Sequence, residues 1–323
     1  MSYPRGASAA LLTALLLLGG CASLPPQTAS LRQDWPAALP QRALLDEARV
    51  SFYPQEDYEC GPAALAMLMS TAGLKLTPEQ LVPQVYLPGR QGSLQQELLA
   101  ASRRQGLVAY RLAPRLETLL RELAAGHPVL VFQNLSLPVA PVWHYALAIG
   151  FDRERGELIL HSGRHAHQTM PLATFERTWE RGGHWAMVAL PPDTLPTTAE
   201  AAPMAVAIAA LERSDKQAAR KAYAHALRRW PAQPTLLLGA GNSAYAAADL
   251  AAAEQAYRAA LSTEPKLADG WNNLAQVLLD QGRPVEARAA LQRALELGGP
   301  RLALYQAFAQ RLDAAPPSSA PLR

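Results

Sequence analysis

The sequence predicts an α+β domain followed by an all-α repeat solenoid, and three observations carry this prediction. The first half mixes short helical and strand patterns, the second half is rich in alanine and repeats itself, and a proline-rich stretch separates the two. With 323 residues the chain is long enough for two domains. The net charge of +3 is small and no basic cluster accompanies it, so we expect no nucleic-acid partner.

The first residues have the pattern of an export signal that ends in lipid attachment. Arg5 supplies a positive start, and Ala9–Leu18 is an apolar run too short to span a bilayer comfortably. A Leu-Gly-Gly-Cys motif follows and ends at Cys21. We expect signal residues 1–20 to be removed and Cys21 to carry acyl chains, which anchor a protein without a transmembrane helix. The alternatives are an uncleaved apolar anchor, or an ordinary signal peptide followed by a chance cysteine.

Composition sets the expected domain boundaries. Ala22 stands where inner-membrane lipoproteins often carry Asp, and this resemblance favours the outer membrane, facing the periplasm. Residues 21–48 begin with a Pro-, Ala- and Gln-rich stretch and predict a tether. Proline-rich residues 192–203 predict a linker between a domain at 49–191 and the repeats at 204–301. Residues 302–323 predict a capping helix and a frayed tail.

The second half repeats with a period of thirty-four residues. Small residues, an aromatic or leucine and a helix-stopping proline recur together: Ala219, Tyr223, Ala226 and Pro231 return as Ala253, Tyr257, Ala260 and Pro265, and in part as Ala287, Leu291 and Ala294. Small alanines let paired helices approach closely, and the larger side chain fills the gap between them. The period and residue types resemble the tetratricopeptide repeat, and this resemblance implies three stacked units that hold a protein partner. An alanine-rich bundle without repeat geometry is the alternative.

The elements of the first half follow an α+β order. Helices are expected at Gly61–Met69, Pro78–Val85, Ser93–Gln105 and Leu116–Ala125. Strands are expected at Val129–Gln133, His144–Gly150, Glu157–His161 and Trp185–Leu190. The second and third strands predict a hairpin around Asp152–Gly156. A helix that starts with a cysteine, followed later by a strand that starts with a histidine, is the order of a papain-like α+β fold.

Cys60 and His144 are the candidate catalytic pair. Only two cysteines are present, so acylation of Cys21 would leave Cys60 without a disulfide partner in an oxidising compartment. A helix start and a nearby imidazolium both stabilise a thiolate, and we therefore expect a lowered pKa for Cys60. Gln55 is placed to donate its amide to a developing oxyanion. The alternatives are a small buried apolar cysteine, a core or rim histidine and a surface glutamine.

Two motifs carry a resemblance to a known family. The segment "QEDYECGPAALAML" around Cys60, followed by "HYALAIGFDRERGELIL" from His144, resembles the family-39 cysteine peptidases over about Ser51–Leu190. The resemblance implies that Cys60 is the nucleophile, His144 the general base and acid, and Gln55 the oxyanion donor. The implied reaction is amide hydrolysis through a thioester, and it needs no metal or organic cofactor.

The sequence departs from this family at the third catalytic position. Family members end the strand after the histidine with an Asp that orients the imidazole, whereas "LILHSG" places His161 and Ser162 there. His161 is therefore the candidate orienting residue, although it lacks the fixed negative charge of a carboxylate. Together with His165 and His167 it also suggests a metal site, but Arg164 and the loop-like sequence favour a solvated polar loop.

Three functions follow from these features. The first is a lipid-anchored cysteine peptidase that cleaves a peptide or protein substrate, with repeats that recruit the substrate or a partner. The second is a catalytically weakened peptidase-like scaffold or binding lipoprotein, which the missing Asp favours. The third is an acyl transferase, because an amine can resolve the same thioester in place of water. Cys60, Gly61 and His144 together favour the first function.

Overall fold

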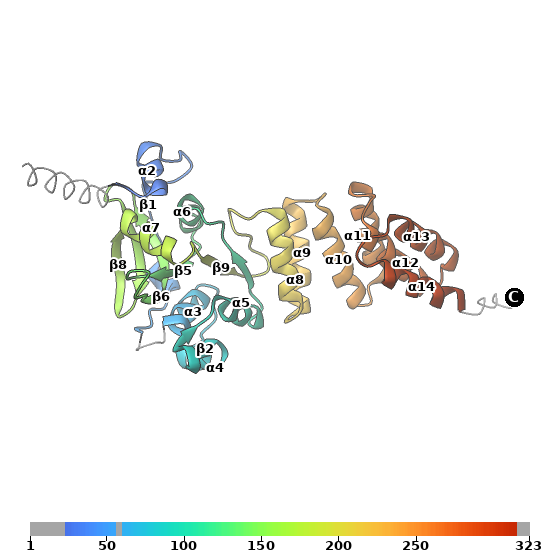
Figure 1. Cartoon of the computed structure of the whole chain (residues 1–323), viewed down its shortest axis with the longest axis horizontal. Helices are drawn as coiled ribbons and strands as arrows, with labels where there is room; N and C mark the ends of the chain where they lie inside the picture. Colours follow the sequence, from blue (N-terminus) through green and yellow to red (C-terminus); the bar gives the residue numbers. More distant parts are fainter. Residues whose placement is uncertain (1–22, 56–59, 315–323) are drawn as a thin grey trace, which may run out of the picture. The chain divides into compact units, whose positions relative to one another are not determined.

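The computed structural model describes residues 23–55 and 60–314 (Figure 1). The predicted signal peptide and Cys21 lie outside the described residues, so their prediction stays untested by the fold. The chain divides into two compact units. The first contains the described residues up to Leu94 together with Arg111–Val188, and the second contains Gln95–Tyr110 together with the described residues from Ala189 onward. No helix within the described ranges is long and apolar enough to cross a bilayer.

A seven-stranded sheet forms the centre of the α+β half, with strand order β4-β9-β5-β6-β7-β8 and β1 paired to β6. The β5–β6, β6–β7, β7–β8, β5–β9 and β1–β6 pairs are antiparallel. The strands are β1 (Arg42–Leu44), β4 (Val108–Arg111), β5 (Val129–Asn134), β6 (Trp143–Asp152), β7 (Glu157–Ser162), β8 (His165–Pro171) and β9 (Ala186–Leu190). The predicted hairpin is therefore present, and the α+β fold class is confirmed.

Helices cover this sheet. They are α2 (Pro26–Gln33), α3 (Cys60–Ser70), α4 (Pro78–Val85), α6 (Leu116–Ala124) and α7 (Leu172–Arg181), with short 3-10 turns at Glu47–Arg49 and Pro88–Arg90 and a small hairpin of β2 (Tyr86–Leu87) and β3 (Gly92–Ser93). Residues 61–69 of α3 are all buried. Gly61 is required there, because a Cβ atom would come within 2.3 Å of the Ser93 Oγ.

The segment expected to be a tether is folded. Helix α2 packs on α7, and Figure 1 shows the two helices together. The buried carboxylate of Glu176 on α7 accepts the backbone N–H groups of Gln27 at 2.8 Å and Thr28 at 2.6 Å. These N–H groups belong to the first turn of α2, where they lack partners within the helix and favour an anion. Glu176 is 149 residues after Gln27 in the sequence, so a distant part of the chain holds this segment in place.

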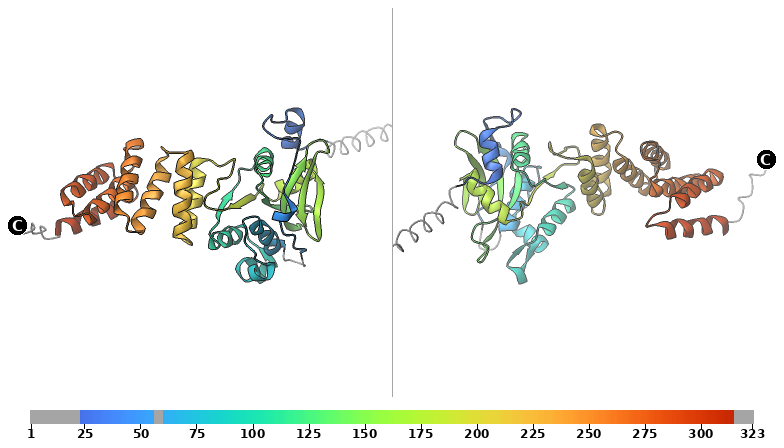
Figure 2. Two further views of the ribbon diagram at one scale, coloured as in Figure 1. Left: turned by 180° about the vertical axis from the view of Figure 1, so that it is seen from behind. Right: turned by 45° about the horizontal axis from the view of Figure 1, so that its top comes forward.

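The second unit contains most of β4 and a succession of helices, which Figure 2 shows from two further sides. The helices are α5 (Gln95–Arg104), α8 (Ala201–Glu212), α9 (Lys216–Arg229), α10 (Pro234–Ala246), α11 (Leu250–Thr263), α12 (Ala268–Asp280), α13 (Pro284–Leu297) and α14 (Leu302–Ala314). Tyr223 and Tyr257 are buried at equivalent places, and their rings come within 2.5 and 2.4 Å of where a Cβ atom would stand on Gly239 and Gly241. Glycine thus lets paired helices close around each tyrosine.

Helix α5 belongs to the second unit. It packs on α8 there, and the Tyr110 hydroxyl accepts the Glu200 N–H at 3.2 Å in the same unit. The predicted first domain, 49–191, includes residues 95–110, and these bounds stay a prediction.

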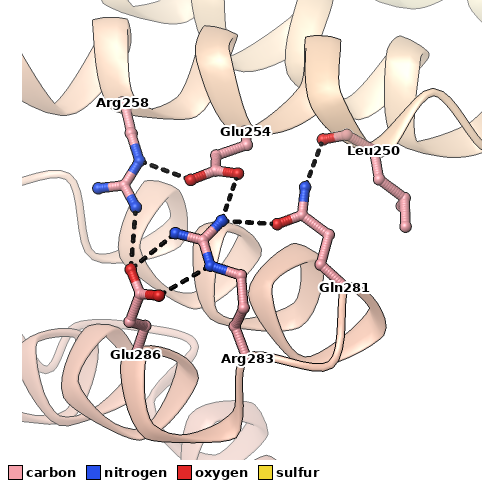
Figure 3. Close-up of polar contacts among 6 residues, drawn as sticks. All are labelled: Leu250, Glu254, Arg258, Gln281, Arg283 and Glu286. Carbon is pink, nitrogen blue, oxygen red and sulfur yellow. Dashed lines mark hydrogen bonds and ion pairs between the residues drawn. The ribbon is translucent and has the colours of Figure 1, made fainter.

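An ion-pair network joins successive repeats (Figure 3). The guanidinium of Arg283 donates to Glu254 and to Glu286, each at 2.7 Å, and Arg258 donates to Glu254 at 2.8 Å. Gln281 donates to the Leu250 carbonyl at 3.3 Å. The network therefore ties α11 to the α12–α13 turn.

Candidate active site

Cys60 is the first residue of α3 and is half-buried where this helix packs on β6. Backbone hydrogen bonding from Tyr145, Gly61 and Cys60 itself lowers the pKa of the Cys60 thiol. Within the described residues it has no disulfide partner. Burial raises the pKa of the Cys60 thiol, because its effect exceeds that of these hydrogen bonds. The expected lowering of this pKa is thus not what the fold produces.

His144 lies in the second position of β6 and is half-buried. Its Nε2 lies 2.9 Å from the Ser162 Oγ at the end of β7. Burial lowers the pKa of His144 to about 4, because the charged imidazolium loses hydration. At neutral pH the imidazole is therefore uncharged. Because Nε2 contacts Ser162, Nδ1 is the ring nitrogen that remains available to accept a proton.

Cys60 lies near the backbone of Tyr145 on β6, which is the residue directly after His144 in the chain. The Tyr145 ring is buried against Phe132 and Trp185, with centroid separations of 4.7 and 6.0 Å, and its hydroxyl donates to the Ser93 carbonyl at 3.1 Å. These contacts fix the strand end that carries the histidine.

Gln55 also contacts the Tyr145 backbone. Its side-chain Nε2 donates to the Tyr145 carbonyl at 3.4 Å, and its Oε1 accepts the Gly163 N–H at 3.2 Å. Its backbone N–H donates to the Gly163 carbonyl at 3.1 Å. Gln55 is buried, so this predicted surface alternative does not apply. The fold therefore brings Gln55 and Cys60 to the backbone of the same residue, one at its carbonyl and one at its N–H.

His161 does not take the orienting place expected for it. It is buried on β7, its ring packs 5.1 Å from that of Phe52 and 4.9 Å from that of His167, and its Nδ1 accepts the His167 N–H at 3.3 Å. Ser162 contacts His144 instead. Leu147 pairs with His161 across β6 and β7, so alternation along the strands puts Ser162 on the same face as His144 and His161 on the other.

The three neighbouring histidines lie on and beside β8 rather than in a loop. His165 begins β8 and is exposed, whereas His167 is half-buried with a positive φ of 55°. No cluster of three or more His, Cys, Asp or Glu side chains suited to a metal ion occurs in the described part of the chain.

A separate pocket of about 420 Å³ lies among the repeats. Asn242 Oδ1 accepts the Tyr257 hydroxyl and the Asn273 amide, each at 2.9 Å. The residues that line the pocket are Asn242, Tyr245, Tyr257, Asn272, Asn273, Gln276, Leu304, Ala307, Phe308 and Arg311. Its amide, aromatic and guanidinium groups are suited to a polypeptide, whose backbone offers both donors and acceptors.

Comparison with known proteins confirms the two resemblances. Residues 47–187 match a family model described as the Peptidase_C39 like family, and residues 204–265 and 238–301 match a tetratricopeptide-repeat model. A solved structure from Bacillus anthracis, described provisionally as a C39-like peptidase, matches with 17% identity and a TM-score of 0.38. That match covers 47% of this chain and 98% of the other. No curated protein matches this chain at a significant level.

Proposed function

We propose that this chain, which joins a peptidase C39-like domain at residues 47–187 to tetratricopeptide repeats at residues 204–301, is a membrane-anchored cysteine peptidase. The observation that supports it best is the convergence at Tyr145. The thiol of Cys60 and the amide of Gln55 both meet its backbone, and His144 directly precedes it. A structural cysteine would need no buried amide and no histidine beside it.

The proposed reaction begins from a neutral pair. His144 removes the thiol proton of Cys60 as the sulfur attacks a substrate carbonyl, so that charge develops only in the transition state. The Gln55 amide and the Cys60 N–H stabilise the resulting oxyanion. His144 then returns the proton to the departing amine, the C–N bond breaks and a thioester remains. Water, deprotonated by His144, attacks the thioester and restores the thiol with release of the acid.

A catalytically weakened peptidase is the second candidate, and Ser162 favours it. A hydroxyl 2.9 Å from the His144 Nε2 orients the ring, but it carries no charge to stabilise the imidazolium. The raised pKa of Cys60 disfavours the thiolate, and the lowered pKa of His144 disfavours the imidazolium. Both shifts therefore oppose a charged pair. We therefore propose slow turnover, because little stabilises the imidazolium that forms as His144 takes the thiol proton.

Anchoring and recruitment complete the proposal. The Leu-Gly-Gly-Cys motif supports acylation of Cys21, and Ala22 supports the periplasmic face of the outer membrane. Tetratricopeptide repeats mediate protein interactions, and the pocket lined by Asn242 and Asn273 is the proposed place where the repeats hold the substrate or a partner.

The test uses the full chain solubilised in mild detergent and a mixture of peptides derived from a bacterial proteome. New peptide termini are counted by mass spectrometry for the wild type and for Cys60→Ala. We expect cleavages that disappear in Cys60→Ala and fall strongly in His144→Ala. Circular dichroism checks that both variants remain folded. Cleavages that persist in folded Cys60→Ala would refute the peptidase, and their complete absence in the wild type would leave the weakened scaffold as the function.

A further inference from the structure

An exposed apolar loop connects β5 to β6 directly before His144. We call residues 135–143 the apolar loop. Val139 is 90% exposed and Trp143 is 52% exposed, and no charged side chain occurs from 128 to 143. Its exposed large apolar side chains are those of Leu135, Leu137, Val139, Val142 and Trp143. A gathering of this kind on one short loop marks an interaction surface.

The loop is held in place by hydrogen bonds. The buried side chain of Asn134 accepts the Ser136 N–H at 3.0 Å and the Val142 N–H at 2.9 Å. The Leu135 N–H donates to the Val142 carbonyl at 2.9 Å, which closes the loop. The Trp143 ring stacks on Phe132, with centroids 5.2 Å apart and planes 11° apart. The apolar side chains are therefore exposed on a loop whose backbone is held by hydrogen bonds.

The loop and the start of the described chain are held by the same helix. Arg181 at the end of α7 donates to the Asn134 carbonyl at 3.2 and 3.1 Å. Arg177, one turn earlier, donates to the Ser23 carbonyl at 2.5 Å. The two arginine positions are about 6 Å apart along the helix axis. Exposed Leu24 follows Ser23 and adds another apolar side chain beside α7.

Chain length then relates the loop to the proposed lipid anchor. Ser23 is two residues after Cys21, so at most about 7 Å of extended chain separates them. An acylated Cys21 would hold this part of α7 at the membrane surface. Apolar side chains that enter the interface beside the acyl chains would add to the association, because binding strength scales with buried apolar area. Trp at a water–lipid boundary and arginines near lipid head groups also suit this position.

We propose that the apolar loop inserts into the lipid interface beside the acylated Cys21, as a second membrane contact. This inference rests on the anchoring proposed above. Since Trp143 directly precedes His144, the contact would place the candidate active site at the bilayer surface. The substrates it favours are then polypeptides held at or near that surface. The occupant is the lipid itself; an extended apolar peptide and a second copy of the chain are the competing occupants.

The test reconstitutes the full lipoprotein into phosphatidylethanolamine–phosphatidylglycerol vesicles whose acyl chains carry bromine, which quenches tryptophan fluorescence on contact. The Trp143 signal is obtained as the difference between the wild type and Trp143→Phe. We expect this signal to be quenched by more than half in the wild type. A double variant, Leu137→Asp with Val139→Asp, should lose most of the quenching. Val285→Asp is the matched control, because Val285 on α13 is 78% exposed and should leave quenching unchanged.

The outcomes separate the inference from the anchoring. Mass spectrometry of the N-terminal peptide reports acylation of Cys21 in the same sample. Acylated protein without Trp143 quenching, or with equal quenching in the double variant, overturns the loop contact and leaves the anchor intact. Unmodified Cys21 overturns the anchor. If the double variant keeps the quenching but its KM for peptide cleavage rises several-fold, the loop binds substrate instead. If the double variant no longer dimerises, the loop contacts a second copy of the chain.

Discussion

Ser162→Asp is the sharpest perturbation of the candidate site. The Ser162 Oγ lies 2.9 Å from the His144 Nε2, so a carboxylate at this position would stand close to the imidazole. A negative charge favours the protonated ring and therefore raises the pKa of His144 from about 4. The substitution also supplies the charge that the related peptidases carry at the third position.

The size of the effect follows from the geometry. Two unit charges about 4 Å apart attract by about 4 kcal/mol at an effective dielectric constant of about 20, which corresponds to roughly 3 pKa units. Ser162 is buried, so dehydration of the new carboxylate removes part of this gain. We expect the pKa of His144 to rise by about 1–2 units, since measured shifts beside an opposite charge are about 1–3 units.

The rate at which iodoacetamide alkylates Cys60 across pH provides the assay. An imidazolium stabilises the neighbouring thiolate, so the rate near pH 7 should rise by about tenfold for each unit by which the pKa of Cys60 falls. Ser162→Asn keeps the size of the new side chain without its charge and should leave the profile near that of the wild type. Equal profiles for the Asp and Asn variants, in folded protein, would refute the reasoning that Ser162 limits the ion pair.

Three further predictions test the fold and its titrating groups. In the wild type, the midpoint of the pH profile for Cys60 alkylation should lie above that of a free cysteine thiol, because burial raises the pKa of the Cys60 thiol; a midpoint at or below that of the free thiol would contradict this. Burial and the charge of a neighbouring histidine lower the pKa of His161 to about 4. Between about pH 6.5 and 4, His161 therefore binds a proton in the unfolded chain but not in the folded one. The unfolding free energy then falls as pH drops through that window. His161→Phe should remove up to about 3 kcal/mol of this acid loss, measured by urea unfolding at pH 7 and pH 4.5, and an unchanged difference would contradict it. Tyr257→Ala should lower the unfolding free energy of the repeats by about 3–5 kcal/mol, because the ring is buried, whereas the control Tyr245→Ala, at a side chain 36% exposed, should cost clearly less by the same circular dichroism assay.

Elements with a local signal could be predicted from the sequence. Helix α4 has the predicted bounds, Pro78–Val85, and its start carries a capping box at Thr77 and Gln80. Helix α7 was not predicted, although Leu172, Phe175 and Trp179 form a buried stripe. Buried Glu176 interrupts the apolar pattern of this stripe, and its purpose is seen only in its bonds to α2. A partner so far away in the sequence produces no periodic pattern of apolar residues that a sequence-based prediction could use.

The candidate site residues stay a prediction, whereas the expected direction of the Cys60 pKa shift was wrong. Cys60 at a helix start, His144 at a strand start and Gln55 nearby in the chain are all visible as sequence positions. The pKa of Cys60 depends on how deeply α3 is packed, and that burial comes from other elements. A rule based on the helix terminus alone therefore gives the wrong direction. Ser162 rather than His161 contacts His144, because the β6–β7 register, which the sequence does not show, puts Ser162 on the face of His144.

A sheltered neutral thiol is consistent with the proposed exported location. Oxidation of cysteine follows thiolate character and exposure, so a thiol with a raised pKa in a half-buried position resists it. In the proposed mechanism the same burial would slow attack on a substrate, because it disfavours loss of the thiol proton. A carboxylate in place of Ser162 would favour the reactive thiolate at all times. The hydroxyl thus fits a peptidase that spends most of its time in an oxidising compartment without substrate, with Cys60 protected until the reaction begins.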